Sequence, residues 1–253
     1  MMQMHPLLPK LKQLRLGGMA DTLEQRCSQA SEKDLNHLEF LVLLLDDELE
    51  RRSQKRYRKN IYRARIDTAK HLASFDFRTS PSVPRGKIEN LALCSFIDRG
   101  ENVLLVGPTG TGKSHIAQAL AHEAVKQGRK VLFRPTHKLL SHLNGCRADG
   151  RYPKRIRELE NIDLLILDDF GLVPLTSQNA EDLYEIIRER YERKSIIVTS
   201  NRAPSEWDEV FGSPLMASAA LDRLTHHSHY IEMKGESYRQ LDRRRENQKT
   251  DNK

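Results

Sequence analysis

The chain has 253 residues and a formal net charge of +7, from 42 Lys and Arg against 35 Asp and Glu. Hydrophobic residues make up 38% and charged residues 30%, a composition that allows a packed core and excludes a disordered chain. The longest apolar run, Phe40–Leu45, ends in two aspartates and is too short to span a bilayer. A basic excess of this size is typical of proteins whose partner is nucleic acid, although it also serves general solubility.

The cysteines give no sign of a structural framework. Cys27, Cys94 and Cys146 lie far apart, none of them at metal-ligand spacing, and an odd number does not indicate a set of disulfides. Three free thiols suit a reducing cytosol. The segment Met1–Lys10 contains two prolines and no apolar signal core. We therefore expect a soluble, cytoplasmic protein.

Residues 1–70 are predicted to form a small all-helical domain. Gly17-Gly18 close a first leucine-rich segment, and Ser31 with Asp34 are candidate caps of a longer helix. The apolar residues that follow recur at helical spacing. They are Leu35, Leu38, Leu41, Val42, Leu45 and Leu49.

A stretch rich in Arg and Lys continues this predicted helix over residues 51–65 and contains no acidic residue. A solvated helix face normally mixes the two signs of charge, because like charges four residues apart repel one another. The stretch therefore predicts contacts with the phosphates of DNA or RNA, with a solvated face as the alternative. The candidate DNA-binding residues are Arg51, Arg52, Lys55, Arg56, Arg58 and Lys59.

Residues 71–87 are rich in Pro and Ser and predict a linker that lies on a second domain through Phe75 and Phe77. In the second domain, 88–253, short apolar runs alternate with helical stretches. This pattern predicts an α/β fold in which helices cover both faces of a parallel sheet. The predicted strands are 103–106, 130–133, 164–167 and 196–199.

The first of these strands leads into a phosphate-binding loop with the spacing G-x-x-x-x-G-K-[ST]. Its residues are Gly107, Pro108, Thr109, Gly110, Thr111, Gly112, Lys113 and Ser114. Glycines allow the backbone amides to point at phosphate oxygens, and the start of the following helix adds partial positive charge. We expect Lys113 to contact the β- and γ-phosphates of ATP, and the Ser114 hydroxyl to ligate Mg²⁺.

Two carboxylates, Asp168 and Asp169, directly follow the apolar run Leu164–Leu167. The carboxyl ends of parallel strands share one edge of the sheet, so both are expected beside the phosphate loop. Asp168 is predicted to hold Mg²⁺, and Asp169 is predicted to polarise the water that attacks ATP. Taken alone, the pair also fits an ordinary turn or helix cap.

Two further residues complete the predicted catalytic set. Asn201 follows the run Ile196–Thr199 at the same edge and is predicted to orient the attacking water, with a turn-forming Asn as the alternative. Arg223, in Leu221-Asp222-Arg223-Leu224, is predicted to reach the γ-phosphate bound by a neighbouring subunit. A structural salt bridge is the alternative for Arg223.

The order and spacing of these elements resemble the AAA+ ATPases. Beyond them, the strings Leu167-Asp168-Asp169-Phe170-Gly171, Thr199-Ser200-Asn201-Arg202, Leu221–His227 and Lys234–Arg239 resemble the IstB family, the ATP-binding helper proteins of insertion sequences. The similarity covers nearly the whole chain. It implies ATP and Mg²⁺ as cofactors and a homo-oligomer that assembles on duplex target DNA. It also implies that the assembly deforms the DNA and recruits or stimulates a partner transposase.

The resemblance has two departures. The second acid of the AAA+ pattern is usually Glu, whereas Asp169 is one methylene shorter, which leaves the rate of turnover open. The chain also ends soon after Arg239, so no full C-terminal lid domain is expected, and Arg239 is a candidate for a lid-type sensor arginine.

A second basic segment, 134–157, occupies the place where initiator-type AAA+ proteins carry an extra helical element facing the central channel. The resemblance therefore directs this segment at DNA phosphates, with little sequence specificity. A solvated surface is the alternative. The candidate residues are Arg147, Arg151, Lys154 and Arg155.

Three other functions compete with a transposition helper. A helicase loader would prefer single-stranded DNA and bind a replicative helicase. A nucleotide switch or scaffold would bind ATP and turn it over slowly, which Asp169 keeps open. A small-molecule kinase is disfavoured by Asn201 and Arg223, because a kinase needs a substrate lid rather than an arginine that faces another subunit.

Overall fold

The computed structural model describes residues 6–235, 237 and 238. Its contacts divide the chain into two compact units, Met1–Lys59 and Asn60–Lys253. The division falls inside helix α3 (His37–Ala64), whereas the sequence suggested a boundary near residue 70. Within the described part of the chain, no helix combines the length and the apolarity that crossing a bilayer requires.

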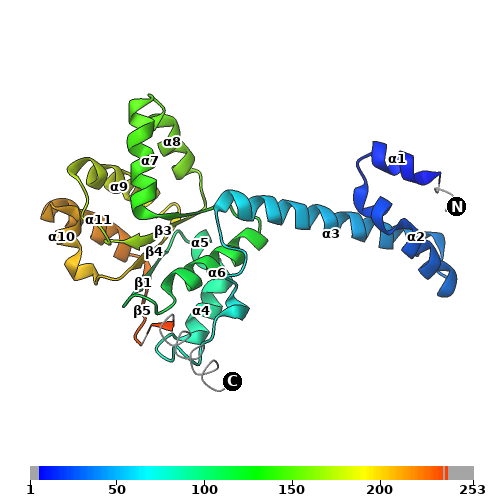
Figure 1. Ribbon diagram of the computed structural model, residues 1–253, viewed down its shortest axis with the longest axis horizontal. Coiled ribbons are helices and arrows are strands. Elements are labelled where there is room, and N and C mark those ends of the chain that lie inside the picture. The colour runs from blue at the N-terminus through cyan, green and yellow to red at the C-terminus, as the bar shows by residue number, and fades with distance from the viewer. Residues whose placement is uncertain (1–5, 236, 239–253) are drawn as a thin grey trace, which may run out of the picture. The chain divides into compact units, whose positions relative to one another are not determined.

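The N-terminal unit consists of α1 (Leu7–Gln13), α2 (Gly17–Glu32) and most of α3, all in blue in Figure 1. Met19, Leu23 and Leu44 form its small buried core. Gly18 allows the helices to approach closely, because a Cβ atom at this position would lie 2.6 Å from the Cα atom of Glu48. The buried Glu48 carboxylate accepts the Gly18 amide at 2.5 Å.

The cap of α3 differs from the predicted one. Ser31 lies inside α2 and Asp34 lies in the turn after it. Asn36 is the cap, since its Oδ1 atom accepts the backbone amides of Leu38 and Glu39 at 2.9 and 3.0 Å. The Glu39 carboxylate accepts the Asn36 amide at 2.9 Å in return, which completes a capping box.

The second unit is built on a five-stranded sheet in which every pair of neighbours is parallel, in the order β2-β3-β4-β1-β5. The strands are β1 (Asn102–Val106), β2 (Val131–Pro135), β3 (Leu164–Phe170), β4 (Ser195–Ser200) and β5 (Ser228–Glu232). The helices are α4 (Arg85–Ala92), α5 (Ser95–Asp98), α6 (Lys113–Lys126), α7 (Thr136–Ala148), α8 (Tyr152–Glu160), α9 (Ser177–Arg190), α10 (Trp207–Phe211) and α11 (Pro214–Thr225), with short 3-10 turns at Leu72–Ser74 and Pro204–Glu206.

Helices cover both faces of this sheet, as predicted. Leu104 and Val106 of β1 belong to one large core cluster with residues of α7 to α11. Val103 and Leu105 are equally buried and point to the opposite face, because successive side chains of a strand alternate. On that face, α6 packs across the central strands and contributes buried residues such as Leu120.

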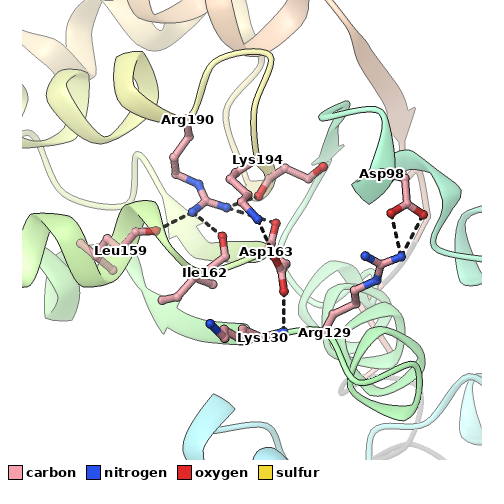
Figure 2. A network of polar contacts seen from close by, with 9 residues as sticks. Asp98, Arg129, Lys130, Leu159, Ile162, Asp163, Arg190 and Lys194 are labelled. Carbon is pink, nitrogen blue, oxygen red and sulfur yellow. Dashed lines mark hydrogen bonds and ion pairs between the residues drawn. The ribbon is translucent and has the colours of Figure 1, made fainter.

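A buried arginine joins the amino ends of the central strands (Figure 2). The Arg190 guanidinium donates to the carbonyl oxygens of Leu159, Ile162 and Ser195 at 2.6, 2.8 and 2.7 Å. Burial lowers the pKa of Arg190 to about 9. Beside it, the Asp163 carboxylate accepts the Lys194 ammonium at 2.5 Å. This network stabilises the edge of the sheet opposite to the phosphate loop.

Candidate nucleotide site

The phosphate loop connects β1 to α6, as the motif predicted. Gly107 and Gly112 have φ angles of 148° and 94°, in the region that favours glycine. A Cβ atom on Gly107 would lie 2.0 Å from the Met233 carbonyl oxygen, so no larger residue fits there. The Thr111 hydroxyl donates to the Pro108 carbonyl oxygen at 3.0 Å and closes the loop. The loop is therefore shaped by its backbone.

Lys113 places a buried cation inside this loop. Its Nζ atom donates to the carbonyl oxygens of Gly107 and Pro108, both at 2.7 Å, and its side chain is 5% exposed. Burial lowers the pKa of the Lys113 ammonium, while the charges of Asp169 and Asp168 act in the opposite direction. A desolvated ammonium beside a helix amino end provides a strong field for an anion.

Asp168 lies at the carboxyl end of β3 and is buried. Burial raises the pKa of its carboxyl group, and hydrogen bonds from the Thr199 and Ser114 hydroxyls act against this rise. Ser114 and Asp168, which the sequence assigned to Mg²⁺, are thus hydrogen-bonded neighbours. A hydroxyl and a carboxylate in contact are oxygen donors of the kind that Mg²⁺ prefers.

Asp169 lies within a register shift in the pairing of β3 with β4, between Leu167 and Phe170. Its backbone is left-handed, with φ of 52°. Its amide donates to the Thr199 hydroxyl oxygen at 3.0 Å, while that same hydroxyl donates to Asp168 at 2.6 Å. Thr199 therefore positions both carboxylates. Sequence analysis missed it, although a Thr at the end of an apolar strand that leads to Asn201 was a usable signal.

A cavity of about 510 Å³ opens beside the phosphate loop. Asp169 and Asn201 line it together with the loop residues from Thr109 to Ser114, so the structure brings both to the site. Asn201 is exposed, which leaves its amide accessible from the cavity. Tyr238 also borders the cavity, and its amide donates to the Gly110 carbonyl oxygen at 3.0 Å.

Residues 67–80, which span the end of the predicted helical domain and the start of the predicted linker, form another wall of this cavity. Its ring Phe75 lies against the loop, since a Cβ atom on Gly112 would be 2.6 Å from the Cε2 atom of that ring. Hydrogen bonds to α6 hold the segment: the Gln118 side chain accepts the Asp67 amide at 2.8 Å, and His122 contacts the Asp67 carbonyl oxygen at 2.9 Å. The wall residues of this segment are Asp67, Ala69, Lys70, Ser74, Phe75, Asp76, Thr79 and Ser80.

Arg223 is not among the residues that line the cavity. It lies on α11, donates to the Ala219 carbonyl oxygen at 2.8 Å, and has its guanidinium carbon 5.4 Å from the ring centroid of Tyr184 and 6.0 Å from that of Tyr191. The structure therefore does not bring Arg223 to the phosphate loop of its own chain, and its role toward a neighbour stays a prediction. Arg239 lies outside the described residues.

The basic residues of α3 fall into two groups. Arg51 lies 3.2 Å from the Asp21 carboxylate, and Arg52 donates to Glu48 at 2.6 Å, so both contribute to the packing of the N-terminal unit. The remaining candidates are exposed and have no carboxylate partner among the described residues. They are Lys55, Arg56, Arg58 and Lys59.

In the second basic segment, 134–157, several of the basic side chains form ion pairs with carboxylates of the same unit. Arg147 pairs with the fully buried Asp182 carboxylate and lies over the Tyr152 ring at 3.7 Å, which joins α7, α8 and α9. Arg151 pairs with Asp149, and Arg155 pairs with Glu158 at 2.8 Å. Lys154 is exposed, with no carboxylate partner among the described residues.

The strand order, the phosphate loop and the carboxylates at the end of β3 define a P-loop nucleotide-binding protein of the AAA+ class. Solved structures agree on the fold. A DNA replication initiation factor matches with a TM-score of 0.59 at 21% identity, over 74% of this chain and 56% of its own. The DnaC helicase loader matches with a TM-score of 0.53 at 23% identity, over 59% of this chain and 88% of its own.

Sequence comparison identifies the family within this class. The family model of the IstB-like ATP binding protein matches residues 9–246, and the chain belongs to this family. An insertion-sequence ATP-binding protein of Mycobacterium tuberculosis is 43% identical over 90% of this chain and 92% of its own length. The ATP-binding protein of insertion sequence IS21 from Pseudomonas aeruginosa is 38% identical, over 96% of this chain and 91% of its own length.

Proposed function

We propose that this protein is an ATP-dependent, DNA-binding transposition helper. It assembles on duplex target DNA as a homo-oligomer, remodels that DNA, and recruits or stimulates a partner transposase. The observation that carries the proposal is the buried Lys113 ammonium in its glycine loop, beside the Ser114–Asp168 pair, in a chain whose relatives are insertion-sequence ATP-binding proteins.

The residues of the site fit ATP with Mg²⁺. A side chain at Gly107 would clash with the Met233 carbonyl oxygen, so glycine is needed there for the loop to keep its shape. Ser114 and Asp168 would hold Mg²⁺, and the metal would neutralise charge that develops on the phosphates. Lys113 binds the β- and γ-phosphates, and the wall from Asp67 to Ser80 encloses the rest of the nucleotide.

Hydrolysis is assigned to side chains that share this cavity. Asp169 polarises the attacking water, and Asn201 orients it toward the γ-phosphate. Arg223 completes the site of a neighbouring subunit, where a guanidinium stabilises the negative charge of the transition state. ATP thereby joins adjacent subunits, and its hydrolysis weakens the contact and resets the complex.

DNA contact is assigned to exposed cations on two elements. On α3 these are Lys55, Arg56, Arg58 and Lys59, and on the α7–α8 element Lys154 is joined by the paired Arg151. Such contacts bind the phosphate backbone and carry little sequence information. Binding is therefore expected to fall steeply with salt, because each neutralised phosphate releases counterions.

The AAA+ fold shared with the DnaC helicase loader keeps helicase loading as the second candidate. The two functions differ in the DNA that they need: a transposition helper assembles on duplex, whereas a loader prefers single strands. A slow nucleotide switch would assemble on neither.

Particle mass on DNA separates these functions. We would measure it by mass photometry with duplex or single-stranded DNA, under ATP or ADP, with Lys113→Ala as the matched control. Large ATP-dependent assemblies on duplex, absent for Lys113→Ala, are the expected result. Assemblies on single strands alone would replace the proposal with helicase loading, and no assembly on either DNA would favour the nucleotide switch.

A further inference from the structure

Away from the nucleotide site, two adjacent histidines at the end of α11 meet a carboxylate from the turn after α9. The histidines, His226 and His227, directly follow the last residue of α11, and Glu192 lies two residues after the last residue of α9. The ligand atoms of these three side chains lie within 4.8 Å of one another. In the part of the chain that the structure describes, no other three His, Cys, Asp or Glu side chains come together in this way.

One carboxylate oxygen faces both imidazoles. The Oε1 atom of Glu192 lies 3.6 Å from Nδ1 of His226 and 3.7 Å from Nε2 of His227. Both distances are too long for hydrogen bonds. They are close to the separation of about 3.3 Å that tetrahedral Zn²⁺ imposes on its ligand atoms, given bonds of about 2.0–2.1 Å. The spacing is therefore that of a metal site rather than that of a hydrogen-bonded cluster.

The local backbone brings these three side chains together. Glu192 has a left-handed backbone, with φ of 56°, a conformation that is uncommon for a residue with a long side chain. The Arg193 amide closes the turn around Glu192 by donating to the Arg190 carbonyl oxygen at 3.0 Å. The rings of His226 and His227 lie side by side, with their centroids 4.0 Å apart. A metal ion would thus find its ligands already gathered.

We propose that Glu192, His226 and His227 bind Zn²⁺ through the three atoms named above. Two imidazoles and one carboxylate are a ligand set that zinc takes in proteins, with a water molecule in the fourth position. All three side chains are exposed, so the ion can enter directly from solvent. Mg²⁺ does not suit this set, because it prefers oxygen ligands in octahedral geometry.

A bound ion would fasten the end of α11 to the turn after α9. The Tyr191 hydroxyl lies 2.8 Å from Nδ1 of His226 and also hydrogen-bonds to the Glu192 carboxylate. This hydroxyl therefore occupies atoms that the metal needs, and Zn²⁺ would displace it. The zinc site shares no residue with the cavity beside the phosphate loop, so it is distinct from the site proposed for ATP and Mg²⁺.

The first test measures Zn²⁺ binding to the full chain by isothermal titration calorimetry, without nucleotide and with excess Mg²⁺ to occupy the nucleotide site. One strong equivalent of Zn²⁺ per chain is expected. Glu192→Gln, and separately His226→Gln with His227→Gln, should weaken its binding at least about tenfold, since even the indirect partners of metal ligands contribute that much. The matched control is His137→Gln with His142→Gln, two exposed histidines of α7, which should leave the titration unchanged.

Three outcomes of this titration would overturn the proposal. One is the absence of any saturable equivalent of Zn²⁺. Another is equal weakening by the control pair, which would mean that Zn²⁺ binds any exposed imidazole. The third is unchanged binding by Glu192→Gln. Because the titration uses neither ATP nor DNA, each of these failures leaves the proposed transposition function standing, and a failure to assemble on duplex leaves the zinc site standing.

The second test uses Tyr191, which competes with the metal and does not ligate it. Tyr191→Phe is expected to tighten Zn²⁺ binding by roughly 2- to 10-fold, because the metal no longer has to displace a hydrogen bond. Weaker binding by this variant would show that the hydroxyl supports the ring of His226 from outside the site. That result would contradict ligation through Nδ1.

The third test separates ligation from a structural role of the carboxylate. Without metal, Glu192→Gln and the unsubstituted protein are expected to unfold at the same temperature. Zn²⁺ at 100 times its Kd should raise the unfolding temperature of the unsubstituted protein alone, by about 5–10 °C, because the ion binds only the folded chain. An equal rise in both proteins would overturn the proposed site.

Discussion

Thr199 on β4 donates a 2.6 Å hydrogen bond to the buried carboxylate of Asp168 on the neighbouring strand β3. The same hydroxyl oxygen accepts the amide of Asp169, so one side chain fixes both acidic positions. The hydroxyl also opposes the rise that burial causes in the pKa of Asp168. Thr199 is therefore a positioning residue for the carboxylates rather than a catalytic residue.

Thr199→Val is expected to reduce ATP turnover about tenfold, since a hydrogen bond to a charged group contributes about 1.5–3 kcal/mol. The loss should be greatest at low pH and low Mg²⁺, because without the hydroxyl the pKa of Asp168 rises further. A pH profile of turnover at two Mg²⁺ concentrations measures this. Thr199→Ser restores the hydroxyl and should restore the profile; an unchanged profile for Thr199→Val would refute the positioning role.

Arg223→Ala is expected to retain ATP binding and to lose ATP-dependent assembly and turnover by tenfold or more, because the guanidinium acts on the nucleotide of a neighbour. The measurement is steady-state turnover together with particle mass. Mixing Arg223→Ala with Lys113→Ala should restore part of the activity, since some interfaces then combine an intact loop with an intact arginine. No recovery in the mixture would argue against a role between subunits.

Lys55→Gln with Lys59→Gln is expected to weaken duplex binding and to lower the slope of log K against log salt by about 2, at roughly 0.9 per phosphate contact. Fluorescence anisotropy over a salt series measures the slope. Lys10→Gln with Lys12→Gln is the matched pair, because these lysines are also exposed in the N-terminal unit. Equal slopes for the two variants would mean that α3 makes no particular contact with DNA.

Glu101 is expected to make stability depend on pH. A hydrogen bond from Arg99 and a second one from His229 lower the pKa of Glu101 to about 2. Its contribution is therefore present above the ordinary pKa of 4.5 and is lost as the pH falls from about 4.5 to about 2. Because Arg99 is half exposed, we expect Glu101→Gln to lower the free energy of unfolding at pH 7 by only about 1–2 kcal/mol. Urea titrations at pH 3 and pH 7 should differ less for the variant.

Arg190→Met is expected to lower the free energy of unfolding by about 3 kcal/mol or more, because it leaves several buried carbonyl oxygens without a donor. These contacts lie at the amino ends of β3 and β4 (Figure 2), away from the phosphate loop. ATP affinity of the folded protein should therefore be unchanged. A large loss of affinity at full folding would show that the two edges of the sheet are coupled.

The phosphate loop and the parallel sheet were predictable because their signals are local. A buried strand appears in the sequence as a run of apolar residues. The phosphate loop, Gly107–Ser114, is a single uninterrupted stretch of the sequence. Strand β5 was missed because it lies at the edge of the sheet, where only Ile231 is fully buried, so no apolar run marks it. The helix cap was placed too early because Ser31, Asp34 and Asn36 are all good caps, and only the packing of α2 selects among them.

The cavity wall from Asp67 to Ser80 was beyond prediction for a different reason. The sequence predicted that residues 67–70 end the helical domain and that residues 71–80 begin a linker. They become part of the site because Gln118 and His122 of α6 hold Asp67 in place. Likewise, nothing near Arg147 in the sequence indicates the buried Asp182 carboxylate that holds it. Contacts between distant segments decide both cases.

The left-handed backbone at Asp169 bears on why this residue is not Glu. Among residues with a side chain, Asp and Asn are enriched severalfold in this conformation, because their short polar side chains can form local hydrogen bonds. The register shift that imposes the conformation also redirects the side chain, as bulges next to active sites commonly do. The backbone geometry thus suits the shorter acid, and replacing Asp169 by the Glu that is usual in the AAA+ pattern is expected to move the carboxylate from its place.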